Sequence, residues 1–309
     1  MKIKKFLLLT SAVISALLIS GCGKQEDKSA IKYVTSCYPV HIIAMNLVEG
    51  IDNVELVKMS ENHSGCLHDF RLQSSDLKNI ENSSAFIING AEMENFVEKV
   101  KEENPNINLI DSSYGISLIG EDCGHDHEEC DEDVNHHHCA VNSHIWLSPE
   151  NYMLQIKNIA EGLKAIDPEH AEKYQENAEN YTNNIRDLKI KMHQELDEFS
   201  GKDLVTFHNA FPYFAKEFRF NILGVMNHEP GEEPSAKEIL DIINLVKNSG
   251  ITAIFTEPQY PDNVAKTISK ETGAEIYTLN PAVTGDNKKD AYIEIMEKNL
   301  EILKIAFER

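Results

Sequence analysis

The sequence predicts an α/β protein with two (β/α) lobes, each built on a mostly parallel sheet, joined by one long helix. Short β-branched runs alternate with helical patterns along most of the 309 residues, which favours parallel strands connected by crossover helices. Between the two halves, about thirty residues after Pro168 contain neither glycine nor a further proline, as expected of an uninterrupted helix.

The first lobe is expected over residues 31–166 and the second over residues 200–309. In the first lobe, the clearest strands are residues 31–36, 54–59 and 85–89. In the second lobe, strands alternate with helices in four β-α units, which are enough for a compact lobe. The strands are residues 203–207, 221–225, 251–256 and 275–279, and the helices are residues 210–218, 235–248, 261–271 and 288–307.

The linking helix is expected over residues 167–199, with Asp167 as its cap and Pro168 as its first helical residue. A helix of this size would be roughly 45 Å long, which exceeds the width of a small domain. Its apolar residues form one modest stripe, which favours a helix that joins two lobes of a monomer over a coiled-coil arm for dimerisation. The stripe consists of Tyr174, Ala178, Tyr181, Ile185, Leu188, Met192 and Leu196.

Residues 1–21 have the pattern of an export signal, with three lysines followed by the apolar stretch 6–19 and small residues. The segment Ile19-Ser20-Gly21-Cys22 resembles the lipobox of bacterial lipoproteins, in which the cysteine carries the lipid. Residues 22–30 would then be a tether, and no later stretch is long and apolar enough to span a bilayer. We therefore expect an extracytoplasmic lipoprotein anchored at Cys22, with an ordinary signal and a chance cysteine as the alternative.

The composition favours cations as ligands. The formal net charge is −22, and removing residues 1–21 makes it about −25 because three lysines are lost with no acid. Such a surface repels nucleic acid and anionic ligands. Five cysteines follow Cys22, and an odd number outside the cytoplasm leaves at least one thiol free or bound to a metal.

Three of the thirteen histidines lie where the predicted fold would place ligands. His208 directly follows the strand 203–207, at the carboxyl end where open α/β sheets bind ligands. His68 lies in the loop after the strand 54–59, and His144 precedes a helix that begins with Ser148 and Pro149. Any single histidine is more often a surface or satisfied core residue, so periodicity alone does not select this set.

Several separated motifs resemble the zinc and manganese solute-binding proteins of ABC importers, known as cluster A-I or zinc-uptake periplasmic proteins. The resemblance covers nearly all of the chain after the tether, and it implies two α/β lobes joined by one long helix. Its motifs are TSCYPVHIIAMNLVEG, HDFRLQSSDLKNI, FIINGAEMENF, SHIWLSPENY, FHNAFPYFAKEF, EPSAKEILDIINLVK and IFTEPQYPDNVAKTISKETGAEIYTLNP.

Carried over position by position, the resemblance places the first three metal ligands of the family at His68, His144 and His208. Two come from the first lobe and one from the second, so the ion would bridge the lobes. In manganese-specific members the third ligand resembles a carboxylate, whereas this chain has His208. Three imidazoles suit Zn²⁺ and Mn²⁺ prefers oxygen, so the sequence favours zinc over a manganese-binding homologue.

The fourth ligand position departs from the family pattern, because Asn280 stands where many members have an aspartate. An amide oxygen is a neutral and weaker ligand than a carboxylate. Asn280 or water is ranked first as the fourth ligand, Glu257 next, and the sulfur of Cys66 last. For Cys66 the alternative is a buried thiol or a disulfide with Cys37.

Residues 121–140 contain five histidines, three cysteines and eight acids, and we expect them to form a loop without a packed core. The segment resembles the His-rich insertion of zinc-type members, which could hold additional Zn²⁺ loosely. The alternative is a tolerated insertion without a function. The loop histidines are His125, His127, His136, His137 and His138.

The expected function is therefore capture of Zn²⁺ between the lobes and its delivery to a membrane permease that a cytoplasmic ATPase powers. A zinc hydrolase is less favoured, because the chain has no HExxH, GxSxG or P-loop motif and no identifiable general base. A surface adhesin is a third class, but the sequence offers no repeat or exposed aromatic array for that role.

Overall fold

The computed structural model describes residues 30–59, 67, 70–120, 141–226, 234–259 and 263–308. Residues 31–309 form one compact unit. Within the described ranges, no helix combines the length and apolar character needed to cross a bilayer. The expected export signal, the lipid site Cys22, the tether up to residue 29 and the His-rich loop lie outside the described residues.

The first sheet contains four parallel strands in the order β2-β1-β3-β4. They are β1 (Ile31–Thr35), β2 (Val54–Lys58), β3 (Ala85–Ile88) and β4 (Leu109–Asp111). The three strands that the sequence predicted are confirmed. The prediction missed β4, because three residues are too few to show the alternation by which a strand is recognised.

The second sheet has the corresponding order β6-β5-β7-β8, again with parallel pairing throughout. Its strands are β5 (Asp203–Thr206), β6 (Asn221–Val225), β7 (Ala253–Thr256) and β8 (Glu275–Thr278), all of which the sequence predicted. The helices are α7 (Pro212–Phe218), α8 (Ala236–Ser249), α9 (Asn263–Thr272) and α10 (Ala291–Phe307). α8 begins after Ser235 because the Ser235 and Glu238 side chains form a capping box.

The described helices of the first half are α2 (Tyr38–Leu47), α3 (Ser74–Glu81), α4 (Val97–Glu103) and α5 (Pro149–Ile166). A 3-10 turn, Ile145–Leu147, precedes α5. α5 begins as the sequence predicted, because Ser148 Oγ accepts a hydrogen bond from Asn151 N at 3.1 Å and Pro149 occupies the first helical position. This start fixes the segment that carries His144.

The long helix α6 (Ala171–Leu196) has 26 residues and is therefore about 39 Å long. It differs from the prediction at both ends, where the 3-10 turns Pro168–His170 and Asp197–Phe199 take the places of the first and last helical residues. The first turn is tightened because the Asp167 carboxylate accepts hydrogen bonds from His170 Nδ1 at 2.7 Å and Tyr174 OH at 2.9 Å. Every residue of the predicted apolar stripe is buried, which confirms the stripe.

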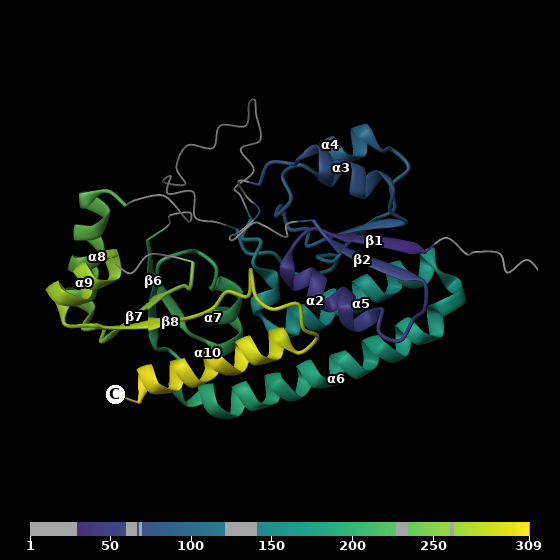
Figure 1. The fold of residues 1–309 in the computed structure, drawn as a ribbon. Helices are drawn as coiled ribbons and strands as arrows, with labels where there is room; N and C mark the ends of the chain where they lie inside the picture. The colour runs from purple at the N-terminus through teal and green to yellow at the C-terminus, as the bar shows by residue number, and fades with distance from the viewer. Residues whose placement is uncertain are drawn as a thin grey trace, which may run out of the picture. The chain divides into compact units, whose positions relative to one another are not determined.

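Both halves contribute to one central hydrophobic core, and the outer face of each sheet has a smaller core of its own. Figure 1 shows α6 running beside α5 toward one of its ends and beside α10 toward the other, in agreement with their contacts. The rings of Tyr152 in α5 and Tyr292 in α10 stack with centroids 3.7 Å apart. The Trp146 indole donates to Pro281 O at 2.8 Å, and Tyr292 OH donates to Trp146 O at 2.8 Å. These contacts hold the two halves together next to the segment that contains His144.

The packing of α5 on the first sheet can be tested at Gly162, where an added Cβ would come 2.8 Å from the side chain of Ile110 in β4. We expect Gly162→Ala to lower the free energy of unfolding by roughly 1 kcal/mol, because overpacking costs about 1–3 kcal/mol and the better helix propensity returns only about 1 kcal/mol. Urea denaturation measures the change. In an Ile110→Ala background, which removes the crowded atoms, Gly162→Ala should stabilise the protein. Equal effects of Gly162→Ala in the two backgrounds would contradict this packing.

Candidate functional site

His208 lies at the carboxyl end of the second sheet, two residues after β5 ends at Thr206, and is 4% exposed. The hydroxyl of Thr206 donates to His208 O at 3.0 Å and fixes the backbone there. Glu257 directly follows β7, which pairs with β5 in parallel, so both side chains come to the same edge of the sheet. His208 Nδ1 lies 3.4 Å from Glu257 Oε2. The carboxylate accepts a hydrogen bond from Nδ1–H, which leaves Nε2 as the ring nitrogen suited to bind a metal.

His144 lies just before the 3-10 turn that leads into α5, and it is 2% exposed. Its Nδ1 lies 3.3 Å from Asn142 Oδ1, and its backbone N donates to the same oxygen at 3.1 Å. The His144 ring contacts the Trp146 ring, with centroids 5.1 Å apart. The loop before α5 thus holds a second imidazole in a fixed orientation.

The structure brings these two predicted ligands together. The rings of His144 and His208 meet edge to face, with centroids 4.8 Å apart and planes at 81°. Each ring has Nδ1 next to an oxygen acceptor, an arrangement that selects the tautomer in which Nε2 carries the lone pair. Two such imidazoles suit a borderline-soft divalent cation such as Zn²⁺.

The third predicted histidine, His68, and the alternative ligand Cys66 lie outside the described residues. Among the residues that are described, no three His, Cys, Asp or Glu side chains come together as a group that could hold a metal ion. The described part of the predicted site therefore contains two histidines, His144 and His208, and His68 stays the predicted third ligand. Cys37, the other residue of the Cys66 alternative, has a free, buried thiol, and burial raises its pKa to about 12.

The two candidates for the fourth ligand differ in their surroundings. Asn280 lies shortly after β8, and its Oδ1 accepts a hydrogen bond from Ala282 N at 2.9 Å. Its backbone N and O both bond to the side chain of Asn299, so this turn is held from the α10 side. Glu257 is 2% exposed and contacts His208 directly. The Glu257 carboxylate therefore orients the His208 ring through Nδ1, and the choice of the fourth ligand stays a prediction.

The model of one protein family, described as ZnuA, zinc-uptake complex component A periplasmic, matches residues 34–306. The chain belongs to this family.

Relatives of known name and structure agree with this membership. The chain is 30% identical over 321 residues to the zinc-binding protein AdcA of Streptococcus pyogenes serotype M3, covering 98% of this chain and 61% of that protein. It is 28% identical over 302 residues to the high-affinity zinc uptake system protein ZnuA of Bacillus subtilis, covering 93% of each. The crystal structure of the Streptococcus pneumoniae AdcAII protein matches 91% of this chain and 100% of that chain, with a TM-score of 0.75 at 27% identity.

These matches confirm the predicted family and the fold of two parallel-sheet halves with a long helix. The chain spans about three fifths of the length of the streptococcal AdcA proteins that it matches.

Sequence reasoning missed the polar residues that support the histidines of this ZnuA-family chain. Asn89, at the end of β3, is fully buried, and its side chain donates to Ser143 O at 2.9 Å, next to His144. Gln155 in α5 donates to both Asn89 Oδ1 at 3.0 Å and Ser112 Oγ at 2.8 Å. Asn89 lies in the quoted motif FIINGAEMENF, but only the fold brings it to Ser143.

The Glu94 side chain binds the backbone N–H of Asn89. Its carboxylate accepts hydrogen bonds from Ser36 Oγ at 2.6 Å, Asn89 N at 2.8 Å and Gly90 N at 3.1 Å. These donors favour the ionised form, yet burial outweighs them and raises the pKa of Glu94 to about 7. The carboxylate thus ties the ends of β1 and β3 to the network beneath His144.

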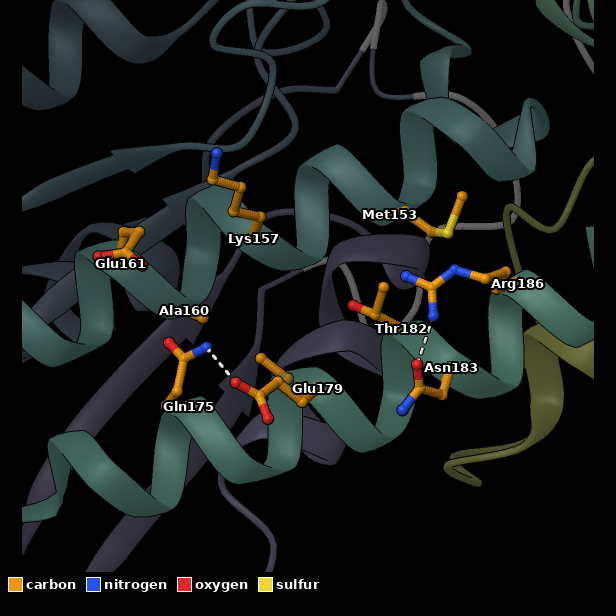
Figure 2. Close-up of a pocket in the computed structure, with 10 residues that line it drawn as sticks. Met153, Lys157, Ala160, Glu161, Gln175, Glu179, Thr182, Asn183 and Arg186 are labelled. Atoms are coloured by element: carbon orange, nitrogen blue, oxygen red, sulfur yellow. Dashed lines mark hydrogen bonds between the residues drawn. The ribbon is translucent and has the colours of Figure 1, made fainter.

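A surface hollow of about 500 Å³ lies away from this network, between α5 and α6. Figure 2 shows its polar side chains, which include Lys157 and Glu161 from α5 and Gln175 from α6. Gln175 bonds to Glu179, and Arg186 bonds to Asn183, within α6. None of the predicted metal ligands lines this hollow. It therefore supplies no argument for metal binding.

The raised pKa of Glu94 predicts that the stability of the protein depends on pH. The pKa of Glu94 in the folded protein, about 7, exceeds its ordinary value of 4.5, so folding takes up a proton. The stability that Glu94 contributes is therefore complete below pH 4.5 and is lost as the pH rises through about 7. Glu94→Gln removes this titration. The stability of the wild type relative to Glu94→Gln should therefore fall by roughly 3 kcal/mol between pH 4.5 and about pH 8.

Urea denaturation across this pH range measures the difference, and other titrating groups cancel between the two proteins. Glu98→Gln is the matched control, because the Glu98 side chain is 81% exposed. Parallel stability curves for wild type and Glu94→Gln would show that the buried carboxyl has no raised pKa.

Proposed function

We propose that this chain is the extracytoplasmic zinc-binding subunit of an ABC importer, which captures Zn²⁺ and delivers it to a membrane permease powered by an ATPase. The observation that carries the proposal is the contact between His144 and His208, two buried imidazoles from different halves of the chain. Relatives over nearly the whole chain are named as zinc-binding or zinc-uptake proteins. Zinc is the substrate that both the ligand chemistry and these names support.

In this proposal, His68, His144 and His208 bind the ion, and Asn280 or water completes the tetrahedron, with Glu257 as the next candidate. Neutral histidines leave the charge of Zn²⁺ uncompensated. The Glu257 carboxylate lies next to His208, and it stabilises the bound ion either as a ligand or through its contact with His208 Nδ1. The side chain of Gln259 donates to Glu257 Oε2 at 2.5 Å. This hydrogen bond restrains the carboxylate beside His208 before the ion arrives.

The delivery step and the anchor rest on the sequence and on the family. The segment Ile19-Ser20-Gly21-Cys22 supports lipidation at Cys22, and a relative from Streptococcus pneumoniae is named a zinc-binding lipoprotein. The chain would act as a monomer held at the outer surface of the cell membrane, where it meets the permease. Residues 121–140 would hold further Zn²⁺ weakly through His125, His127, His136, His137 and His138.

Metal selectivity tests the proposal. Competition between Zn²⁺ and Mn²⁺ on demetallated protein should strongly favour zinc, because imidazole nitrogen suits Zn²⁺ and Mn²⁺ prefers oxygen. His208→Asp should narrow this preference by roughly tenfold or more, equivalent to about 1.4 kcal/mol. Calorimetric competition titrations measure both constants.

His193→Ala is the matched control for removing an imidazole, because His193 lies in α6 and bonds to Asp197. Its zinc preference should equal that of the wild type. Equal or preferential binding of Mn²⁺ by the wild type would end the zinc proposal.

A second prediction separates the His-rich loop from the folded site. Ligands held by the folded scaffold should bind one ion tightly, whereas binding by the loop must order flexible backbone at roughly 1–2 kcal/mol per residue. Deleting residues 121–140 should keep the tight event in calorimetry and remove any weaker ones. His144→Ala with the loop intact should do the reverse. Loss of the tight event on deleting the loop would place the principal site in the loop.

A further inference from the structure

Asn142 connects the two candidate ligands through one side chain. It is 1% exposed, and its Oδ1 accepts hydrogen bonds from His144 N at 3.1 Å and His144 Nδ1 at 3.3 Å. Its Nδ2 donates to Asn209 O at 2.6 Å, and Asn209 directly follows His208. Its backbone O accepts from Tyr213 OH at 2.9 Å. One amide therefore contacts the His144 ring in the first half and the His208 segment in the second.

The partners of Asn142 fix the orientation of its amide. The backbone N of His144 can only donate, so it must face the amide oxygen. The carbonyl of Asn209 can only accept, so it must face the amide nitrogen. A flipped amide would place its nitrogen against the His144 N–H and its oxygen against the Asn209 carbonyl. Burial makes that arrangement costly.

This orientation determines the tautomer of His144. Because Asn142 Oδ1 only accepts, His144 Nδ1 must carry the proton in the neutral ring. The lone pair then lies on Nε2, and the ring is held ready to bind a metal through that atom. Residues that orient a ligating histidine in this way typically change metal affinity by about 10- to 100-fold when replaced.

We propose that Asn142 is a positioning residue for zinc capture: it holds the Nε2-ligating tautomer of His144 and ties that ring to the backbone next to His208. The inference rests on the proposed function, in which His144 and His208 bind Zn²⁺. It adds a residue that acts through His144 and that joins the ligands of the two halves.

The test compares Asn142→Ala with Asn142→Asp in the full chain, using zinc as the probe. Asn142→Ala should weaken zinc binding about 10- to 100-fold and allow both neutral tautomers of His144. Asn142→Asp keeps an acceptor for Nδ1 but loses the donor to Asn209 O, so it should retain the tautomer and weaken zinc binding less than Asn142→Ala does. Competition titration measures affinity, and nitrogen NMR of labelled histidine in the metal-free protein at about pH 8 measures the tautomer.

Asn177→Ala is the matched control for losing a buried amide. Asn177 is 7% exposed and donates to Leu47 O at 2.9 Å and Glu49 O at 2.8 Å, so its loss should reduce stability without changing zinc affinity or the His144 tautomer. Asn142→Ala behaving like Asn177→Ala in zinc affinity and tautomer would overturn the inference. Equal losses in Asn142→Asp and Asn142→Ala would also overturn it. If His144→Ala leaves the tight binding of the wild type unchanged, the proposed function fails instead.

Discussion

The candidate site depends on burying two imidazole rings against each other. His144 and His208 are 2% and 4% exposed, so a ring N–H without an acceptor would cost about 1–3 kcal/mol. Asn142 and Glu257 meet this requirement from different halves of the chain. The same contacts that satisfy the buried N–H groups also select Nε2 as the nitrogen with the lone pair. Folding and ligand orientation are therefore served by one set of hydrogen bonds.

Parallel sheets explain why these groups meet. In the second half, the pairing of β5 with β7 brings the residues that follow them to one edge, which places His208 beside Glu257. In the first half, the end of β3 supplies Asn89, which holds the carbonyl just before His144. Each histidine thus comes from a loop whose backbone is fixed by a strand end.

The shared core restricts how the two halves can move. Tyr152 stacks on Tyr292, and the Trp146 indole bonds to Pro281 O, close to both His144 and Asn280 in the sequence. Glu217 in α7 also accepts hydrogen bonds from Ser148 Oγ and Glu150 N at the start of α5, and burial raises the pKa of this carboxyl. A wide separation of the halves would expose this core. Small rotations and local loop changes fit these contacts better than a wide hinge opening.

The sequence by itself determined the fold class, seven of the eight strands in the described ranges and the long helix, because periodicity and motif order are local properties of the chain. It missed β4, whose three residues carry no periodic pattern. It also predicted that the long helix includes the residues at both of its ends that form 3-10 turns in the structure. It also singled out His144 and His208, but only the tertiary structure decided that their rings touch, that Glu257 contacts His208, and that Asn142 joins both segments. Asn142 and Asn209 are 67 residues apart in the chain, and no local pattern encodes a hydrogen bond over that separation. Such a bond exists only because two independently predicted halves pack on a common core.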